Sequence, residues 1–263
     1  MQFSMQGRKA LITGGSLGIG LAIGETFARA GASVALVARR ADVLEQARAK
    51  CLAAGAPKAV AISADVGTAA DCERAFKEAV AGMGGVDVLV NNAGTSQRGP
   101  FESISDELWQ HDLDLKLFAA IRLARLALPA MKANRFGRII NVLNTGAKAP
   151  PAEGAPTAVS RAAGMALTKV LAGEGARHNV LVNGLLVGRI ESDQWVRRHE
   201  ADKAKGSNQS MEDYYAAMGK SLPMGRLGTA QEFANAALFL ASDAGSYITG
   251  TAINVDGGLC PVV

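Results

Sequence analysis

The sequence predicts an α/β fold: a doubly wound, parallel, seven-stranded sheet with helices on both faces. Two observations carry this prediction. Short apolar runs alternate with amphipathic runs of helical period along the whole chain, and the first apolar run leads directly into a glycine-rich turn. Parallel strands need long crossover connections, which the helical runs supply. No repeat, low-complexity segment or change in composition marks a boundary, so we expect one domain over residues 1–263.

The strand candidates are apolar almost throughout, as expected of strands that are covered on both faces. In order they are Lys9–Thr13, Ser33–Ala38, Ala59–Ser63, Val86–Val90, Arg138–Leu143, Val180–Leu185 and Ala252–Val255. The intervals carry apolar residues three or four positions apart, which predicts helices at Leu21–Ala30, Ala41–Ala54, Ala69–Met83, Glu107–Ala133, Thr157–Ala176 and Ala230–Ala241. Open parallel sheets bind ligands beyond the carboxyl ends of their strands. Residues that directly follow strands are therefore the first candidates for function.

The most informative segment is Thr13-Gly14-Gly15-Ser16-Leu17-Gly18-Ile19-Gly20, which joins the first strand to the first helix. Glycines let the backbone approach a phosphate closely, and the helix N-terminus offers unpaired N–H groups and a positive dipole end. The segment predicts a dinucleotide site and a sheet of the Rossmann type.

The residues after the second strand bear on the choice of dinucleotide. An acidic residue there would bind the 2′-hydroxyl of the adenosine ribose, whereas an arginine would pair with a 2′-phosphate. This chain has Ala38 followed by Arg39 and Arg40. We therefore expect NADP(H) to be preferred over NAD(H).

Composition excludes several other classes of protein. Hydrophobic residues make up 49% and charged residues 20%, which is enough for a large core and too few charges for disorder. The net charge of +4 arises from basic residues scattered among acidic ones, so we expect no nucleic-acid partner. The three cysteines lack metal-ligand spacing, so no metal site is expected, and the absence of a long apolar stretch predicts a cytoplasmic protein without a membrane partner.

Several motifs in fixed order resemble the short-chain dehydrogenase/reductase family over essentially the whole chain. They are Thr13-Gly14-x-x-x-Gly18-x-Gly20, Asp65-Val66, Asn91-Asn92-Ala93-Gly94, Arg138-Ile139-Ile140-Asn141-Val142, His178-Asn179-Val180-Leu181-Val182-Asn183, and Thr249-Gly250 with Asn254-Val255-Asp256-Gly257-Gly258. The resemblance implies a set of cofactor-binding residues: Gly14, Ser16, Gly18, Ile19 and Gly20 at the pyrophosphate, Asp65 and Val66 at the adenine, Asn91, Ala93 and Gly94 at the ribose, and Gly188, Ile190 and Ser192 at the nicotinamide.

The catalytic positions depart from the family. The family uses an Asn-Ser-Tyr-Lys set, but no tyrosine of this chain is followed four positions later by lysine. Counting from flanking motifs assigns the four positions to Asp114, Asn144, Thr157 and Arg161. Threonine lacks the acidity of a phenol, Arg161 can bind ribose but cannot release a proton, and Asn144 can still donate to a carbonyl oxygen. Replacement acids include Tyr214, Tyr215 and Lys148.

Two functions remain open at this point. One is an NADP(H)-dependent oxidoreductase that acts on a ketone or secondary alcohol, of 3-oxoacyl type by resemblance, with a non-standard proton donor. The other is a catalytically inactive NADP(H)-binding sensor or partner subunit. A polar insert at about 192–222 is expected to form a flap over the substrate. Apolar residues on the two long helices, namely Leu113, Leu117, Leu126, Met165, Leu167 and Leu171, predict a homotetramer or homodimer.

Overall fold

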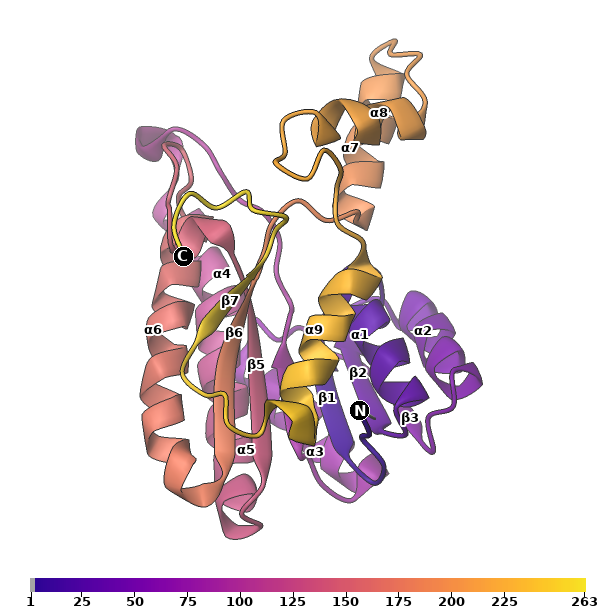
Figure 1. Cartoon of the computed structure of the whole chain (residues 1–263), viewed down its shortest axis with the longest axis vertical. Coiled ribbons are helices and arrows are strands. Elements are labelled where there is room, and N and C mark those ends of the chain that lie inside the picture. The colour runs from indigo at the N-terminus through magenta and orange to yellow at the C-terminus, as the bar shows by residue number, and fades with distance from the viewer. Residues whose placement is uncertain (1–2) are drawn as a thin grey trace.

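The computed structural model describes residues 3–263 and confirms the predicted sheet. Seven parallel strands lie in the order β3-β2-β1-β4-β5-β6-β7 (Figure 1). Their bounds are β1 Lys9–Thr13, β2 Ser33–Ala38, β3 Ala59–Ser63, β4 Val88–Asn91, β5 Gly137–Asn144, β6 Val180–Val187 and β7 Ala252–Val255. Strands β5 and β6 run further toward the site than predicted, because Asn144 continues to pair with Val187.

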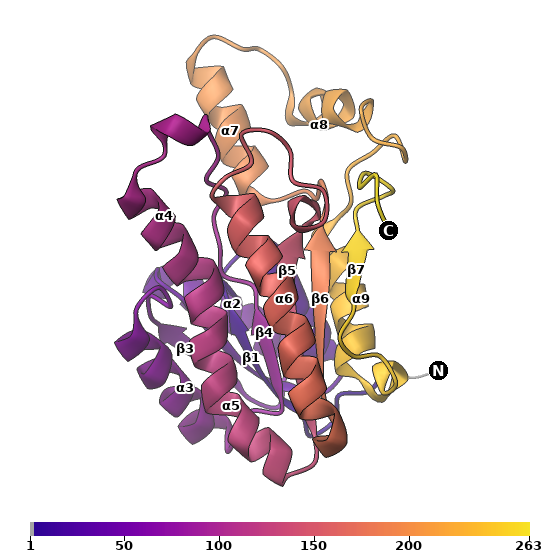
Figure 2. The same ribbon diagram turned by 90° about the vertical axis from the view of Figure 1, so that its left-hand side faces the viewer.

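Helices cover both faces of the sheet (Figures 1 and 2). One face packs against α1 Gly18–Arg29, α2 Ala41–Ala53 and α9 Ala230–Ala241. The other packs against α3 Ala69–Met83, α5 Ala119–Ala133 and α6 Thr157–Gly175. Each of these helices lies within a helix expected from its apolar period or matches one within a few residues, except that α5 covers only the second part of the predicted helix Glu107–Ala133.

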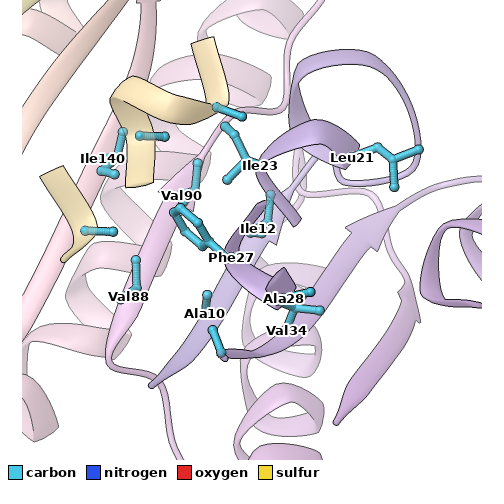
Figure 3. Close-up of a cluster of buried hydrophobic side chains, with 14 of the residues drawn as sticks. Ala10, Ile12, Leu21, Ile23, Phe27, Ala28, Val34, Val88, Val90 and Ile140 are labelled. Atoms are coloured by element: carbon cyan, nitrogen blue, oxygen red, sulfur yellow. The ribbon is translucent and has the colours of Figure 1, made fainter. Parts of the chain in front are cut away.

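The core on the first face is centred on α1. Phe27 and Ile23 project from this helix onto Ile12 and Val90, which lie on neighbouring strands (Figure 3). All four side chains are fully buried. This packing fixes the axis of α1 and therefore the direction in which its N-terminus points.

The predicted helix at Glu107–Ala133 is divided in the structure. Helix α4 covers Asp106–Leu113, a π-helical turn covers Asp114–Phe118, and α5 continues from Ala119. A π-helical turn adds a residue to one turn of the helix and so rotates the side chains that follow it. Such a turn cannot be predicted from the spacing of apolar residues. It affects which residue of this segment reaches the site.

The polar insert forms two helices, α7 Asp193–Ala204 and α8 Met211–Gly219. Both lie beyond the carboxyl ends of the strands, apart from the main body of the fold (Figures 1 and 2). Among the described residues, no helix combines the length and apolar character needed to cross a membrane.

The outer face of α6 is apolar and uncovered. Val159 is 50% exposed and Val170 is 58% exposed, with Ala166 exposed between them on the same side of the helix. Leu171 belongs to the core and Leu167 packs against it, so the apolar surface lies at other residues of α6 than the sequence indicated. Rows of small and β-branched residues allow two helices to approach closely.

We expect this face to pack against a second copy of the chain. Val170→Asp places a charge in the centre of the face and should lower the molecular mass measured by light scattering at micromolar concentration. Leu52→Asp, at an exposed leucine on α2, is the matched control and should leave the mass unchanged. A monomeric unmutated protein would contradict the prediction.

Candidate active site

A cleft of about 1580 Å³ opens at the carboxyl ends of the strands, where the fold class leads us to expect a ligand. It runs from the ends of β2 and β3, past the turn between β1 and α1, to the ends of β5 and β6. Typical small-molecule pockets measure about 300–1,000 Å³. The cleft is therefore large enough for a dinucleotide together with a substrate.

The glycine-rich turn fits a pyrophosphate closely. Gly14 and Gly18 have φ of 64° and 54°, in the left-handed region that favours glycine. A Cβ on Gly20 would overlap the carbonyl oxygen of Gly14, so only glycine allows α1 to begin this close to the turn. The first turn of α1 has no acidic residue and no side-chain cap, which leaves its N–H groups available to an anion.

Hydrogen bonds connect this turn to the end of β4. The Thr13 hydroxyl accepts from the backbone N–H groups of Asn92 and Ala93, each at 3.0 Å. The Asn92 side-chain amide donates to the carbonyl oxygens of Thr13 and Gly14 at 3.0 and 3.2 Å. Asn92 was not among the predicted site residues, although its position next to a strand end was the signal that could have identified it.

One end of the cleft is basic. The exposed side chains of Arg39 and Arg40 line it next to Asp65 and Val66. Asp65 is the only acidic residue among the described residues of the wall, and its Oδ1 accepts from the N–H of Gly67 at 3.0 Å. In this wall, no carboxylate follows β2, which is the position at which an acidic residue would bind the 2′-hydroxyl of an adenosine ribose.

The structure brings the predicted cofactor residues together with one exception. The wall contains Gly14, Ser16, Gly18, Ile19, Gly20, Arg39, Arg40, Asp65, Val66, Ala93, Gly94, Arg161, Gly188, Ile190 and Ser192. Asn91 is not in the wall: it is buried, and its amide donates to Asn141 Oδ1 at 2.8 Å, between β4 and β5.

Three of the four predicted catalytic positions meet at the far end of the cleft. Asn144, Thr157 and Arg161 all line it. Asn144 Oδ1 is buried and has no hydrogen-bond partner among the described residues, so this amide is available to a ligand. Arg161 packs directly against Gly94, and burial, opposed by the charge of Asp112, lowers the pKa of its guanidinium to about 10.

The hydroxyl of Thr157 is already engaged. It donates to the carbonyl oxygen of Gln97 at 2.8 Å and accepts from the N–H of the same residue at 3.0 Å. It also accepts from Lys116 Nζ at 2.7 Å. These bonds fasten the loop after β4 to the start of α6.

Asp114 does not join this group. Its carboxylate accepts from Arg122 and Gln110 at 2.9 and 2.8 Å, and it does not line the cleft. The π-helical turn instead directs Lys116 toward Thr157. The sequence analysis assigned Asp114 to the site by counting from flanking motifs, whereas in the structure Lys116 is the residue of this segment that reaches Thr157.

Lys116 and Asp112 form an ion pair whose side chains are completely buried. Asp112 Oδ2 also accepts from the hydroxyl of Ser160 at 2.6 Å. Burial lowers the pKa of Lys116 to about 8, with the charge of Arg161 lowering it further and Asp112 opposing both. Lys116 is thus a buried cation with a lowered pKa that lies behind Thr157 of the cleft wall, and sequence reasoning did not identify it.

The replacement acids considered from sequence lie elsewhere. Tyr214 stacks against His199 with ring centroids 5.3 Å apart, and Tyr215 lies beside Tyr214. Lys148 donates to the carbonyl oxygen of Ala252 at 2.8 Å. None of these residues lines the cleft, and the part of the chain that is described holds no cluster of metal-ligating side chains.

Comparison with known proteins gives matches over almost the whole chain. Residues 14–260 match the family model described as enoyl-(acyl carrier protein) reductase. The 3-oxoacyl-[acyl-carrier-protein] reductase of Escherichia coli is 35% identical over 256 residues, covering 97% of this chain and 98% of that protein. The gluconate 5-dehydrogenase of Gluconobacter oxydans is 32% identical over 263 residues, covering 98% and 96%.

A solved structure agrees with the fold in detail. L-sorbose reductase from Gluconobacter frateurii, in complex with NADPH and L-sorbose, superposes with a TM-score of 0.95 at 33% identity. The match covers 100% of both chains.

The two aspartates near Lys116 should differ sharply in their effect on stability. Asp112→Asn leaves the Lys116 ammonium buried without a counter-charge, which costs about 3–5 kcal/mol. Asp114→Asn, the matched control, removes a half-exposed pair and should cost less than about 1 kcal/mol. Urea unfolding at pH 7 measures both. The Asp112→Asn loss should shrink as pH rises toward about 8, because Lys116, whose pKa Asp112 no longer raises, becomes neutral at a lower pH in the variant than in the unmutated protein.

Proposed function

Because the chain belongs to the short-chain dehydrogenase/reductase family of NAD(P)-dependent oxidoreductases, we propose that it reduces a ketone, or oxidises a secondary alcohol, with NADP(H). We further propose that its proton source differs from the tyrosine of that family. The observation that carries the proposal is the continuous cleft, which joins most of the predicted cofactor-binding residues to Thr157, the hydrogen-bond partner of a buried lysine.

The chain's own residues fit the dinucleotide. The glycine turn and the N-terminus of α1 would hold the pyrophosphate, Asp65 and Val66 the adenine, and Arg161 the ribose next to the nicotinamide. Gly188, Ile190 and Ser192 would border the nicotinamide itself. The bound cofactor supplies the hydride for reduction or accepts it in oxidation.

The preference for NADP(H) rests on Arg39 and Arg40. Both are exposed in the cleft wall, so a 2′-phosphate could reach their guanidinium groups without displacing an existing ion pair with any described residue. A bidentate guanidinium–phosphate contact is among the stronger polar contacts in proteins. The named complex of L-sorbose reductase with NADPH supports the same choice.

Arg39→Ala should remove most of the discrimination between the two cofactors. A hydrogen bond to a charged group contributes about 1.5–3 kcal/mol, which corresponds to a loss of about 10- to 150-fold in NADPH affinity, with NADH affinity nearly unchanged. Titration of each cofactor by fluorescence or calorimetry measures this. Lys50→Ala, at a position of α2 outside the cleft wall, is the control. Equal affinity of the unmutated protein for NADPH and NADH would contradict the prediction.

Polarisation of the substrate carbonyl falls to Asn144 and Arg161. The Asn144 side-chain amide can turn its NH₂ group toward a carbonyl oxygen, and Arg161 places a positive charge at the same end of the cleft. Donors fixed in advance around the oxygen that becomes negative lower the barrier to hydride transfer.

Protonation of that oxygen falls to Thr157 and Lys116. The Thr157 hydroxyl would turn from Gln97 and give its proton to the alkoxide, while Lys116 Nζ gives a proton to Thr157 Oγ1 across the 2.7 Å hydrogen bond. Lys116 is then neutral and takes up a proton from solvent in the next cycle. A donor with a pKa of about 8 suits this role at neutral pH.

The pH dependence of reduction tests this pathway. We expect kcat/KM for carbonyl reduction to fall as pH rises through about 8, because Lys116 must be protonated. Lys116→Met should lower the rate by about 10²–10⁴-fold and abolish the fall. The double variant Asp112→Asn with Lys116→Met avoids a buried lone carboxylate and should behave in the same way. Lys148→Met, at a lysine outside the wall, should keep the unmutated profile, and a profile unchanged in the folded Lys116 variants would refute the pathway.

A second function is favoured by the engaged hydroxyl of Thr157. All its hydrogen bonds in this structure are to the protein, which would suit a subunit that binds NADP(H) without turnover. The two functions separate in one experiment: NADPH titration followed by a panel of ketones that includes L-sorbose and a 3-oxoacyl thioester. Binding without oxidation of NADPH by any ketone supports the sensor or partner subunit.

A further inference from the structure

We propose that the substrate carries an anionic group, a carboxylate or a phosphate, and that Arg98, Arg189 and Arg198 bind it. The proposal concerns the substrate of the reaction proposed above. It rests on three arginines that line the cleft at the end away from Arg39 and Arg40.

The three arginines come from three different segments. Arg98 lies in the loop after β4, which pairs with the chain at Pro156. Arg189 follows β6 directly, and Arg198 lies on α7. Residues far apart in sequence therefore place three guanidinium groups around one chamber, next to the ends of β5 and β6 where Asn144 is also found.

Among the described residues, no acid of the cleft wall lies near these arginines to balance their charge. Asp65 is the only acid among the described residues of the cleft wall, and it follows β3, with β2, β1, β4 and β5 between it and β6. Glu191, close in sequence to Arg189, does not line the cleft, and its charge contributes, after burial, to raising the pKa of Tyr215. Among described carboxylates, none lies within 4.0 Å of Arg98, Arg189 or Arg198.

Two of the guanidinium groups lie against the indole ring of Trp195. Arg189 lies 5.6 Å and Arg198 lies 4.8 Å from the centre of its ring. Stacking on an aromatic ring uses the face of a guanidinium and leaves its N–H edge for an anion. Like charges held on one indole repel each other, and an anion bound between them relieves the repulsion.

Several other residues that line the cleft are uncharged. Ala149, Pro151, Leu259 and Pro261 are small or apolar and border the same end of the cleft. Because the arginines lie in the cleft wall rather than on a flat outer surface, they suit the head group of a small oxo acid or sugar phosphate better than an acidic protein. Arginine binds carboxylate and phosphate alike through two parallel N–H bonds, so the structure assigns the charge of the group and the test separates the two kinds.

The experiment compares ketones that carry an anionic group with close neutral relatives. The pairs are acetoacetate with its methyl ester, and fructose 6-phosphate with fructose; each is titrated calorimetrically into the NADPH-saturated protein and assayed for oxidation of NADPH. We expect at least one anion to exceed its neutral partner by about 10-fold or more in affinity and in kcat/KM. This preference should weaken between 50 and 500 mM salt, and which pair shows it identifies carboxylate or phosphate.

Arg189→Gln and Arg198→Gln should each reduce the affinity and kcat/KM for the anion about tenfold relative to those for its neutral partner. Lys203→Gln, at an exposed lysine of α7 outside the cleft wall, is the matched control and should change neither. Equal use of anionic and neutral ketones would overturn this proposal and leave the proposed function intact. Selective binding of anions without turnover would support the arginine site and count against the reductase. Anion preference retained in both arginine variants would also overturn the proposal.

Discussion

The geometry of the site depends on the hydrogen bonds that connect the ends of β1 and β4. The sheet extends outward from β1 through β2 and β3 in one direction and from β4 through β7 in the other, so the crossover connections diverge at this point and leave a crevice. Thr13 and Asn92 hold the two strand ends together with hydrogen bonds that involve both backbone and side chains. These hydrogen bonds position the glycine turn, the start of α1 and the loop that carries Gly94.

The buried ion pair of Asp112 and Lys116 determines the charge next to Thr157. Two cations, Lys116 and Arg161, face one carboxylate, so the positive charge is only partly balanced, and burial lowers the pKa of both. A net positive charge next to the reacting group stabilises an oxygen that gains negative charge. Burial of such a pair is costly in itself, which makes a role in binding or proton transfer a better account of it than stability.

The cleft is basic at both ends and nearly free of acids between them. Arg39 and Arg40 stand at one end and Arg98, Arg189 and Arg198 at the other, while Asp65 is the single described acid of the wall. A cleft lined by one sign of charge concentrates ligands of the opposite sign. This distribution of charge suits a polyanionic dinucleotide. At the end where the substrate would lie, it favours a ligand that is negatively charged.

The fold and most of the residues that line the cleft could be predicted from the sequence. Apolar period, strand length and glycine spacing act over a few neighbouring residues, so β1, β2, β3, β7, α3 and α9 could be placed with the bounds that the structure has. The tertiary structure alone decided the rest. A π-helical turn directed Lys116 rather than Asp114 to Thr157, packing between β4 and β5 buried Asn91, and folding brought Arg98, Arg189 and Arg198 around one chamber. Such juxtapositions depend on the rotation of a helix and on contacts between distant segments, which local patterns do not encode.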